Sequence, residues 1–122
     1  MRVFSCVGEI FRNFMWLKRI PYGYKVFIYG AGEYGHYIRD VLAKERSDLE
    51  FVGFIETYRD GFNIIKWEEF KRRGLGENEI IIIGSCTFWK DMVEDVKEMR
   101  FKYIVPCLDV YFRLWGKYKW KK

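Results

Sequence analysis

The chain has 122 residues, half of them hydrophobic and one fifth aromatic. It is long enough for one hydrophobic core and too apolar for a disordered chain. Its net charge of +5 is concentrated in residues 1–20 and 111–122, whereas residues 21–110 carry more acidic than basic side chains, which argues against a nucleic-acid-binding surface on the central segment. The three cysteines form no C-x-x-C pair, as is typical of reduced thiols in a cytoplasmic protein.

The first predicted element is a helix over residues 3–17, which Pro21 and Gly23 bring to an end. Charged and polar residues interrupt its apolar run, so we interpret it as a retained helix rather than a signal peptide. Its apolar residues are too numerous to remain uncovered, and we expect them to pack on the domain or on a second copy in a homo-oligomer. These residues are Val3, Phe4, Val7, Ile10, Phe11, Phe14, Met15, Trp16 and Leu17.

Strands and helices then alternate along the chain. Residues 25–29 form a short apolar run typical of a buried parallel strand, and residues 33–45 return to helical spacing. A second strand is predicted over 51–55, followed by a brief extended piece at 62–65. A short helix at 67–73 is expected to end at Gly74.

The strongest strand prediction is the isoleucine run at 80–83, which ends at Gly84. Ser85 or Thr87 can cap the following helix, and a last short strand covers 103–105. The helix should turn its apolar side chains toward the sheet. These side chains are Trp89, Met92, Val93, Val96 and Met99.

This alternation predicts one α/β domain with a mostly parallel sheet of about four strands between two helical layers. The strand at 25–29 should be central, with 51–55 on one side and 80–83 on the other. Parallel neighbours need a crossover of a dozen or more residues. The 62–65 piece is therefore expected to be a small edge extension rather than a full parallel strand.

A glycine-rich loop follows the first strand directly and opens a helix. Its residues are Gly30, Ala31, Gly32, Glu33, Tyr34 and Gly35, a G-x-G-x-x-G pattern in the context that favours nucleotide binding. Gly30 permits a tight turn, Gly32 allows the backbone to approach a phosphate, and Gly35 allows the helix to pack on the strand. Helix N–H groups at 32–35 then favour an anion. The alternative is that these glycines only form a compact turn.

An acidic residue is expected about 20 residues further on, at the end of the second strand, where it can bond ribose hydroxyls. Glu56 directly follows that strand and fits this role. Its carboxylate would repel a 2′-phosphate and favour NAD or a uridine or adenine nucleotide over NADP, although Arg59 could reverse that preference. The alternative for Glu56 is a solvated loop acid.

Together these residues carry a family resemblance over residues 25–106. The carriers are the strand and loop at 26–35, the Gly-Phe-Ile-acid ending at 53–56, and the Ile-Ile-Ile-Gly-Ser strand end at 81–85. This stretch resembles the small Rossmann-like domains of bacterial sugar acetyltransferases and nucleotide-sugar epimerases and dehydratases. It is also similar to NADH-sensing repressors and CoA-binding domains. The resemblance implies a nucleotide or UDP-sugar ligand in glycan or polysaccharide metabolism, with any catalytic residues in a partner protein.

Four other candidate site residues, at 85–87 and at 36, each have two alternative roles. Ser85, Cys86 and Thr87 follow a central strand, where ligands bind in open α/β sheets, and serve either as ligand contacts or as packed cap residues. His36 either faces a phosphate or lies on the helix surface. One histidine and three scattered cysteines give no metal-site pattern. The only Tyr-x-x-x-Lys match, Tyr118 to Lys122, falls at the chain end.

The segment 111–122 interleaves aromatic and basic residues. This composition suits contact with a membrane surface, an anionic partner or nucleic-acid bases, or simply a covered sheet edge with solvated lysines. The sequence therefore leaves two functions open. One is a nucleotide or nucleotide-sugar binding module, and the other is a ligand-sensing or protein-interaction module whose interface is made by the terminal segments.

Overall fold

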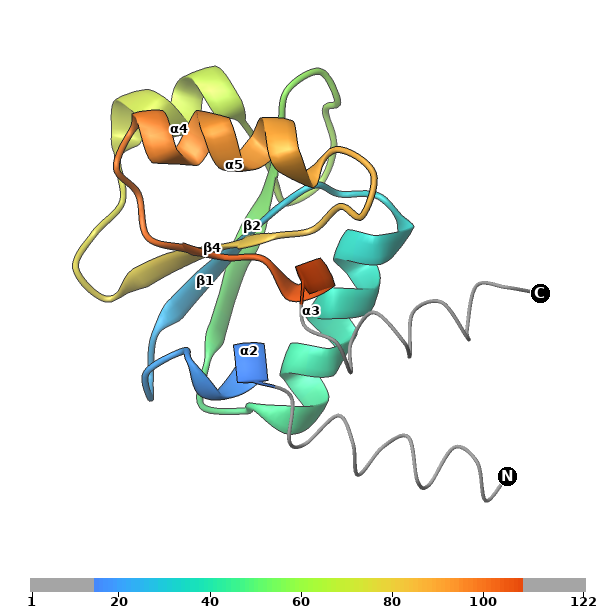
Figure 1. Ribbon diagram of the computed structural model, residues 1–122, viewed down its shortest axis with the longest axis vertical. Coiled ribbons are helices and arrows are strands. Elements are labelled where there is room, and N and C mark those ends of the chain that lie inside the picture. The colour runs from blue at the N-terminus through green and yellow to red at the C-terminus, as the bar shows by residue number, and fades with distance from the viewer. Residues whose placement is uncertain (1–14, 109–122) are drawn as a thin grey trace.

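The computed structural model describes residues 15–108 (Figure 1). Within them the chain is α/β with a five-stranded, all-parallel sheet in the order β3-β2-β1-β4-β5, an arrangement compatible with a Rossmann-like fold. The strands are β1 (Lys25–Tyr29), β2 (Glu50–Glu56), β3 (Ile64–Lys66), β4 (Glu79–Ile83) and β5 (Tyr103–Ile104). The helices are α2 (Met15–Lys18), α3 (Glu33–Glu45), α4 (Trp67–Arg73), α5 (Trp89–Glu98) and a 3₁₀ turn at Pro106–Leu108.

The sheet separates two hydrophobic clusters because side chains alternate along β1. Val26 and Ile28 face the cluster that includes residues of α2 and α3, whereas Phe27 and Tyr29 face the cluster that includes residues of α4 and α5. Figure 1 shows α4 and α5 over one face of the sheet and α3 and α2 on the other. The predicted three layers and the central position of β1 are therefore confirmed.

Most predicted element bounds agree with the structure to within a residue. The helices at 33–45 and 67–73 are confirmed, and Gly74 ends α4 with a φ of 81°. The apolar side of α5 packs as expected, with Val96 fully buried and Trp89, Met92, Val93 and Met99 half-buried on the sheet. The last strand is one residue shorter than predicted, ending at Ile104.

The small edge piece predicted at 62–65 adds a fifth strand to the four that were expected. The expected edge extension at 62–65 is a three-residue parallel strand, β3, paired with β2 from Phe54↔Ile64 to Glu56↔Lys66. The connection from β2 to β3 contains no helix, because the loop has to return along only the last three residues of β2, Phe54 to Glu56. Asn63, with a φ of 60°, turns the chain, and its carbonyl accepts a hydrogen bond from the Phe54 N–H at 2.8 Å.

The N-terminal helix lies largely outside the described residues. Only residues 15–17 of the predicted 3–17 segment are described, as part of α2, and there Trp16 and Leu17 are buried against the domain itself. The predictions of self-association through Phe4, Phe11 and Phe14, and of a surface role for 111–122, also fall on undescribed residues.

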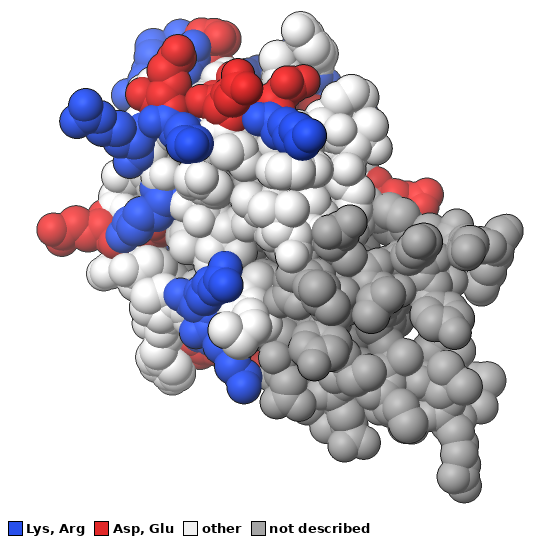
Figure 2. All heavy atoms as spheres, in the orientation of Figure 1, with Lys and Arg blue, Asp and Glu red and all other residues white. Residues whose placement is uncertain are grey.

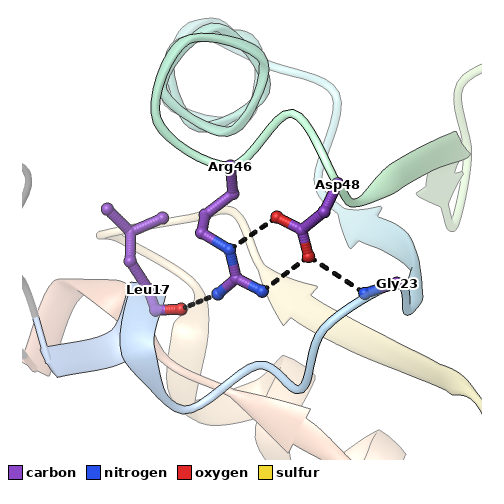
Figure 3. Close-up of polar contacts among 4 residues, drawn as sticks. All are labelled: Leu17, Gly23, Arg46 and Asp48. Carbon is purple, nitrogen blue, oxygen red and sulfur yellow. Dashed lines mark hydrogen bonds and ion pairs between the residues drawn. The ribbon is translucent and has the colours of Figure 1, made fainter.

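An arginine at the C-terminal end of α3 bonds to α2 on the same face of the sheet (Figure 3). The Arg46 guanidinium donates two hydrogen bonds of 2.8 Å to the Asp48 carboxylate and one of 2.6 Å to the Leu17 carbonyl. Asp48 also accepts the Gly23 N–H at 2.9 Å. These bonds, with the neighbouring Arg46 as the main cause, hold the pKa of Asp48 far below its usual range. The cluster lies at the end of the sheet where β1 and β2 begin.

Candidate functional site

The glycine loop connects the end of β1 to the start of α3. Gly30 has a φ of 117°, a conformation that residues with a side chain rarely adopt. Its N–H donates to the Ile55 carbonyl at 2.9 Å, and the Gly84 N–H donates to the Tyr29 carbonyl at 2.8 Å. The loop is therefore fixed to the ends of both neighbouring strands.

Three glycines bring the loop, α3 and β4 into contact. A Cβ at Gly35 would meet the Gly30 carbonyl, and a Cβ at Gly84 would lie 2.7 Å from the Ile28 Cγ2 and 3.1 Å from the Gly35 Cα. Gly35 is buried and is not among the described residues that line the cleft beside the loop. This position agrees with the predicted role of Gly35, which is to allow α3 to pack closely on the strand and loop before it.

Gly32 differs from the other loop glycines. It is the N-cap residue of α3, with φ −83° and ψ −165°, and a Cβ built on it would meet no atom within 4 Å. Neither its backbone conformation nor its protein neighbours require a glycine. The N–H groups of the first helical turn, residues 33–35, begin beside it and have no carbonyl four residues back within the helix.

Glu56 is tied to the loop in a way that the sequence did not predict. Its Oε2 accepts the Ala31 N–H at 2.5 Å, so the carboxylate supports the loop backbone. Arg59 donates to the Ala31 carbonyl at 3.1 Å and lies 4.0 Å from the same carboxylate oxygen. Glu56 also lines the cleft. A ribose contact from Glu56 remains a prediction.

A cleft of about 650 Å³ opens over the carboxyl ends of β1, β2 and β4, beside the N-terminus of α3. β1 lies between β2 and β4, so the chain order reverses here, which is where open α/β sheets bind ligands. The structure brings most predicted site residues into this cleft. They are Gly30, Gly32, Glu33, Tyr34, Glu56, Ser85, Cys86 and Thr87.

The turn between β4 and α5 forms one wall of the cleft. The Ser85 Oγ accepts the N–H groups of Phe88 at 2.8 Å and Thr87 at 3.2 Å, so it stabilises this turn. The prediction that Ser85 or Thr87 caps the following helix is wrong, because the N-cap residue of α5 is Phe88, with no side-chain cap bond. Cys86 is exposed at the cleft. Burial, followed by the neighbouring Cys86, raises the pKa of Tyr34 far above its usual range. The Tyr34 hydroxyl therefore stays protonated at any physiological pH.

A shallower hollow lies outside the loop and holds the remaining candidate side chains. Ala31, His36 and Arg59 line it, together with part of α3. His36 is exposed, with its ring 4.5 Å from the Phe54 ring. It therefore lies on the outer surface of α3 and does not line the main cleft.

Several cleft residues escaped the sequence analysis. Tyr29 ends β1 and donates its hydroxyl to the Asp95 Oδ2 at 2.9 Å, and Asp91 lies one helical turn before Asp95. Tyr58 and Phe88 add exposed aromatic rings to the lining. The spacing of Asp91 and Asp95 placed both on one face of the helix, but only the position of α5 in the structure shows which face borders the cleft.

Charges in the cleft are unevenly distributed. Glu33, Glu56, Asp91 and Asp95 line it, and Arg59 is the one basic side chain that residues 15–108 contribute to the lining. Within residues 15–108, no group of three or more His, Cys, Asp or Glu side chains is arranged to hold a metal ion. The Tyr118-to-Lys122 pair lies outside these residues.

None of the helices in the described part of the chain is long and apolar enough to cross a membrane. Comparison of the whole chain with protein-family models finds no matching family, and comparison with curated proteins finds no significant match.

Proposed function

We propose that the chain is a Rossmann-like nucleotide-binding module for NAD or a nucleotide sugar, acting in glycan metabolism. The observation that carries the proposal is the open position of Gly32. Gly30 and Gly35 are explained by a strained backbone and by close packing, but nothing in residues 15–108 requires a glycine at 32. A phosphate that must approach the backbone supplies the missing reason.

The ligand's phosphates lie against the first turn of α3, where the helix N–H groups and the helix dipole favour an anion. The ribose lies toward Glu56, and the rest of the ligand extends past Ser85 and Thr87. A volume of about 650 Å³ falls within the range of small-molecule and cofactor clefts. The position at the reversal of strand order supports the same placement.

We assign binding rather than a reaction to this chain. Domains that resemble it through residues 25–106 work beside catalytic domains of sugar-modifying enzymes. A separate catalytic partner, or a second copy of the chain, is therefore the expected setting for any chemistry on the bound nucleotide.

A thermal-shift panel tests the proposal. NAD and UDP-sugars at millimolar concentration should raise the melting temperature, because a ligand that binds only the folded state stabilises it. Gly32→Val should abolish the shift, since its side chain fills the space that the phosphate needs.

Unfolding of Gly32→Val without ligand provides the control. Because a Cβ at this position meets no described atom within 4 Å, the variant should lose little more than the advantage of glycine as an N-cap, about 1 kcal/mol. A panel of nucleotides that leaves the wild-type melting temperature unchanged would contradict the proposal. So would a Gly32→Val protein that binds as well as the wild type.

A further inference from the structure

The face of α5 that borders the cleft presents two carboxylates. Asp91 and Asp95 are four residues apart and both line the cleft. Asp91 is exposed and Asp95 is half-buried. Each offers acceptor oxygens to whatever part of a ligand extends beyond its phosphates.

A buried tyrosine orients Asp95. Tyr29 is only 1% exposed, and its ring stacks on Trp67 with the ring centroids 5.0 Å apart. Its hydroxyl donates to the Asp95 Oδ2 at 2.9 Å and lies 3.4 Å from the Thr57 Oγ1. Burial is the main reason that the pKa of Tyr29 is raised, and the nearby Asp95 raises it further. Tyr29 therefore remains a donor and keeps Asp95 in place as an acceptor.

The charge of the cleft contrasts with that of the outer surface. Figure 2 shows charged side chains of both signs close together over α4 and α5. Inside the cleft, acidic side chains outnumber Arg59, which is held at the loop by the Ala31 carbonyl. No basic side chain in the lining comes from α5, so an anionic group placed there would face like charges.

Exposed aromatic rings complete this part of the cleft. Tyr58 follows β2 and is 90% exposed, and Phe88 precedes α5 and is 62% exposed. Both line the cleft, so a bound ring would gain apolar contact area while its hydroxyls reach the carboxylates. The combination of aromatic faces and acceptor oxygens suits a neutral sugar better than a phosphate or a carboxylated sugar.

We propose that Asp91 and Asp95, with Asp95 positioned by Tyr29, select a nucleotide sugar whose terminal hexose is uncharged and discriminate against an anionic one. This inference rests on the proposed nucleotide-binding function. It predicts a specificity that depends on α5, whereas phosphate binding depends on Gly32.

The test compares UDP-glucose, UDP-glucuronate and UDP by calorimetry. The two sugars carry the same base and phosphates and differ by one carboxylate. UDP-glucose should bind at least about tenfold more tightly than UDP-glucuronate, because like charges across a site disfavour binding. The double variant Asp91→Asn/Asp95→Asn should reduce this difference to less than about threefold. Glu94→Gln, an exposed change on the same helix outside the cleft lining, should leave it unchanged.

Tyr29→Phe tests the positioning role. It should weaken UDP-glucose while leaving UDP unaffected, a selective loss that a general weakening of the fold would not produce. Equal affinity of the wild type for the two sugars, or an unchanged difference in the double variant, would overturn the inference and leave nucleotide binding intact. Failure of all three ligands to bind, with NAD also failing, would overturn the proposed function. NAD binding without UDP-glucose binding would overturn only the sugar inference.

Discussion

Replacing Gly35 by alanine should destabilise the protein, even though alanine is the better helix former. The new Cβ would lie 3.0 Å from the Gly30 carbonyl carbon and closer still to its oxygen, whereas non-bonded carbon atoms attract one another at roughly 3.5–4.0 Å. The loop backbone cannot rotate away easily, because the Gly30 N–H is bonded to β2 and its φ is 117°. The start of α3 must therefore shift.

The size of the effect follows from two opposing contributions. Overpacking of a tight contact costs about 1–3 kcal/mol and more where the backbone is fixed, and we take roughly 3 kcal/mol here. The gain in helix propensity from glycine to alanine is about 1 kcal/mol. The net loss should be about 2 kcal/mol, or roughly 8 °C in melting temperature for a chain of this size.

Urea unfolding followed by circular dichroism measures this loss, and Gly32→Ala is the matched control. Both glycines lie at the start of α3, but the alanine Cβ at 32 meets nothing within 4 Å. That variant should stay within about 1 kcal/mol of the wild type. A Gly35→Ala protein as stable as the wild type would show that the loop and helix do not make the contact described.

Two further predictions concern the charged clusters. Arg46→Ala removes the bonds to Asp48 and Leu17 and should lower the urea midpoint more than Arg39→Ala, which breaks an exposed pair worth at most about 1 kcal/mol. Glu79 is bonded to Arg73 at 2.8 Å, which lowers its pKa from 4.5 to about 2. The contribution of ionised Glu79 to the free energy of unfolding is therefore present above pH 4.5 and is lost as the pH falls toward 2. The difference in unfolding free energy between wild type and Glu79→Gln should therefore shrink as the pH falls from 4.5 toward 2, which urea unfolding at several pH values measures.

The sequence predicted the parts of the fold that depend on local pattern. The isoleucine run of β4, the period of α3 and the glycine that ends α4 each carry a strong signal within a few residues. The sequence predicted a small edge piece where β3 lies but not its parallel pairing with β2, because that pairing depends on how far the loop must return. The left-handed Asn63 that makes the return possible has no distinctive sequence signal beside Gly61.

The sequence analysis identified the candidate site residues of the glycine loop. It did not identify the residues that α5 contributes to the cleft. A loop that joins a strand to a helix carries its own motif, so Gly30 to Gly35 could be found from spacing alone. Asp91, Asp95 and Tyr29 line one cleft, and Tyr29 bonds to Asp95, only because β1 and β4 are neighbours in the sheet and α5 packs over them. That proximity is a property of the tertiary arrangement, and an acidic residue on a helix has many ordinary explanations.

Glu56 shows how the structure changes the design of an experiment. Its predicted ribose role suggests Glu56→Ala, but that variant would also remove the acceptor for the Ala31 N–H and loosen the loop. A loss of NAD affinity could then arise from the loop alone. Glu56→Gln retains an acceptor oxygen for Ala31 and removes only the negative charge.

Glu56→Gln should therefore separate the two roles. If the charge repels a 2′-phosphate near Arg59, the variant should bind NADP at least about threefold better relative to NAD than the wild type does. Its melting temperature without ligand should stay close to that of the wild type, because the bond to Ala31 is kept. Calorimetry with NAD and with NADP gives the ratio of the two affinities. An unchanged ratio in a stably folded Glu56→Gln protein would limit Glu56 to supporting the loop and would remove it from nucleotide selection.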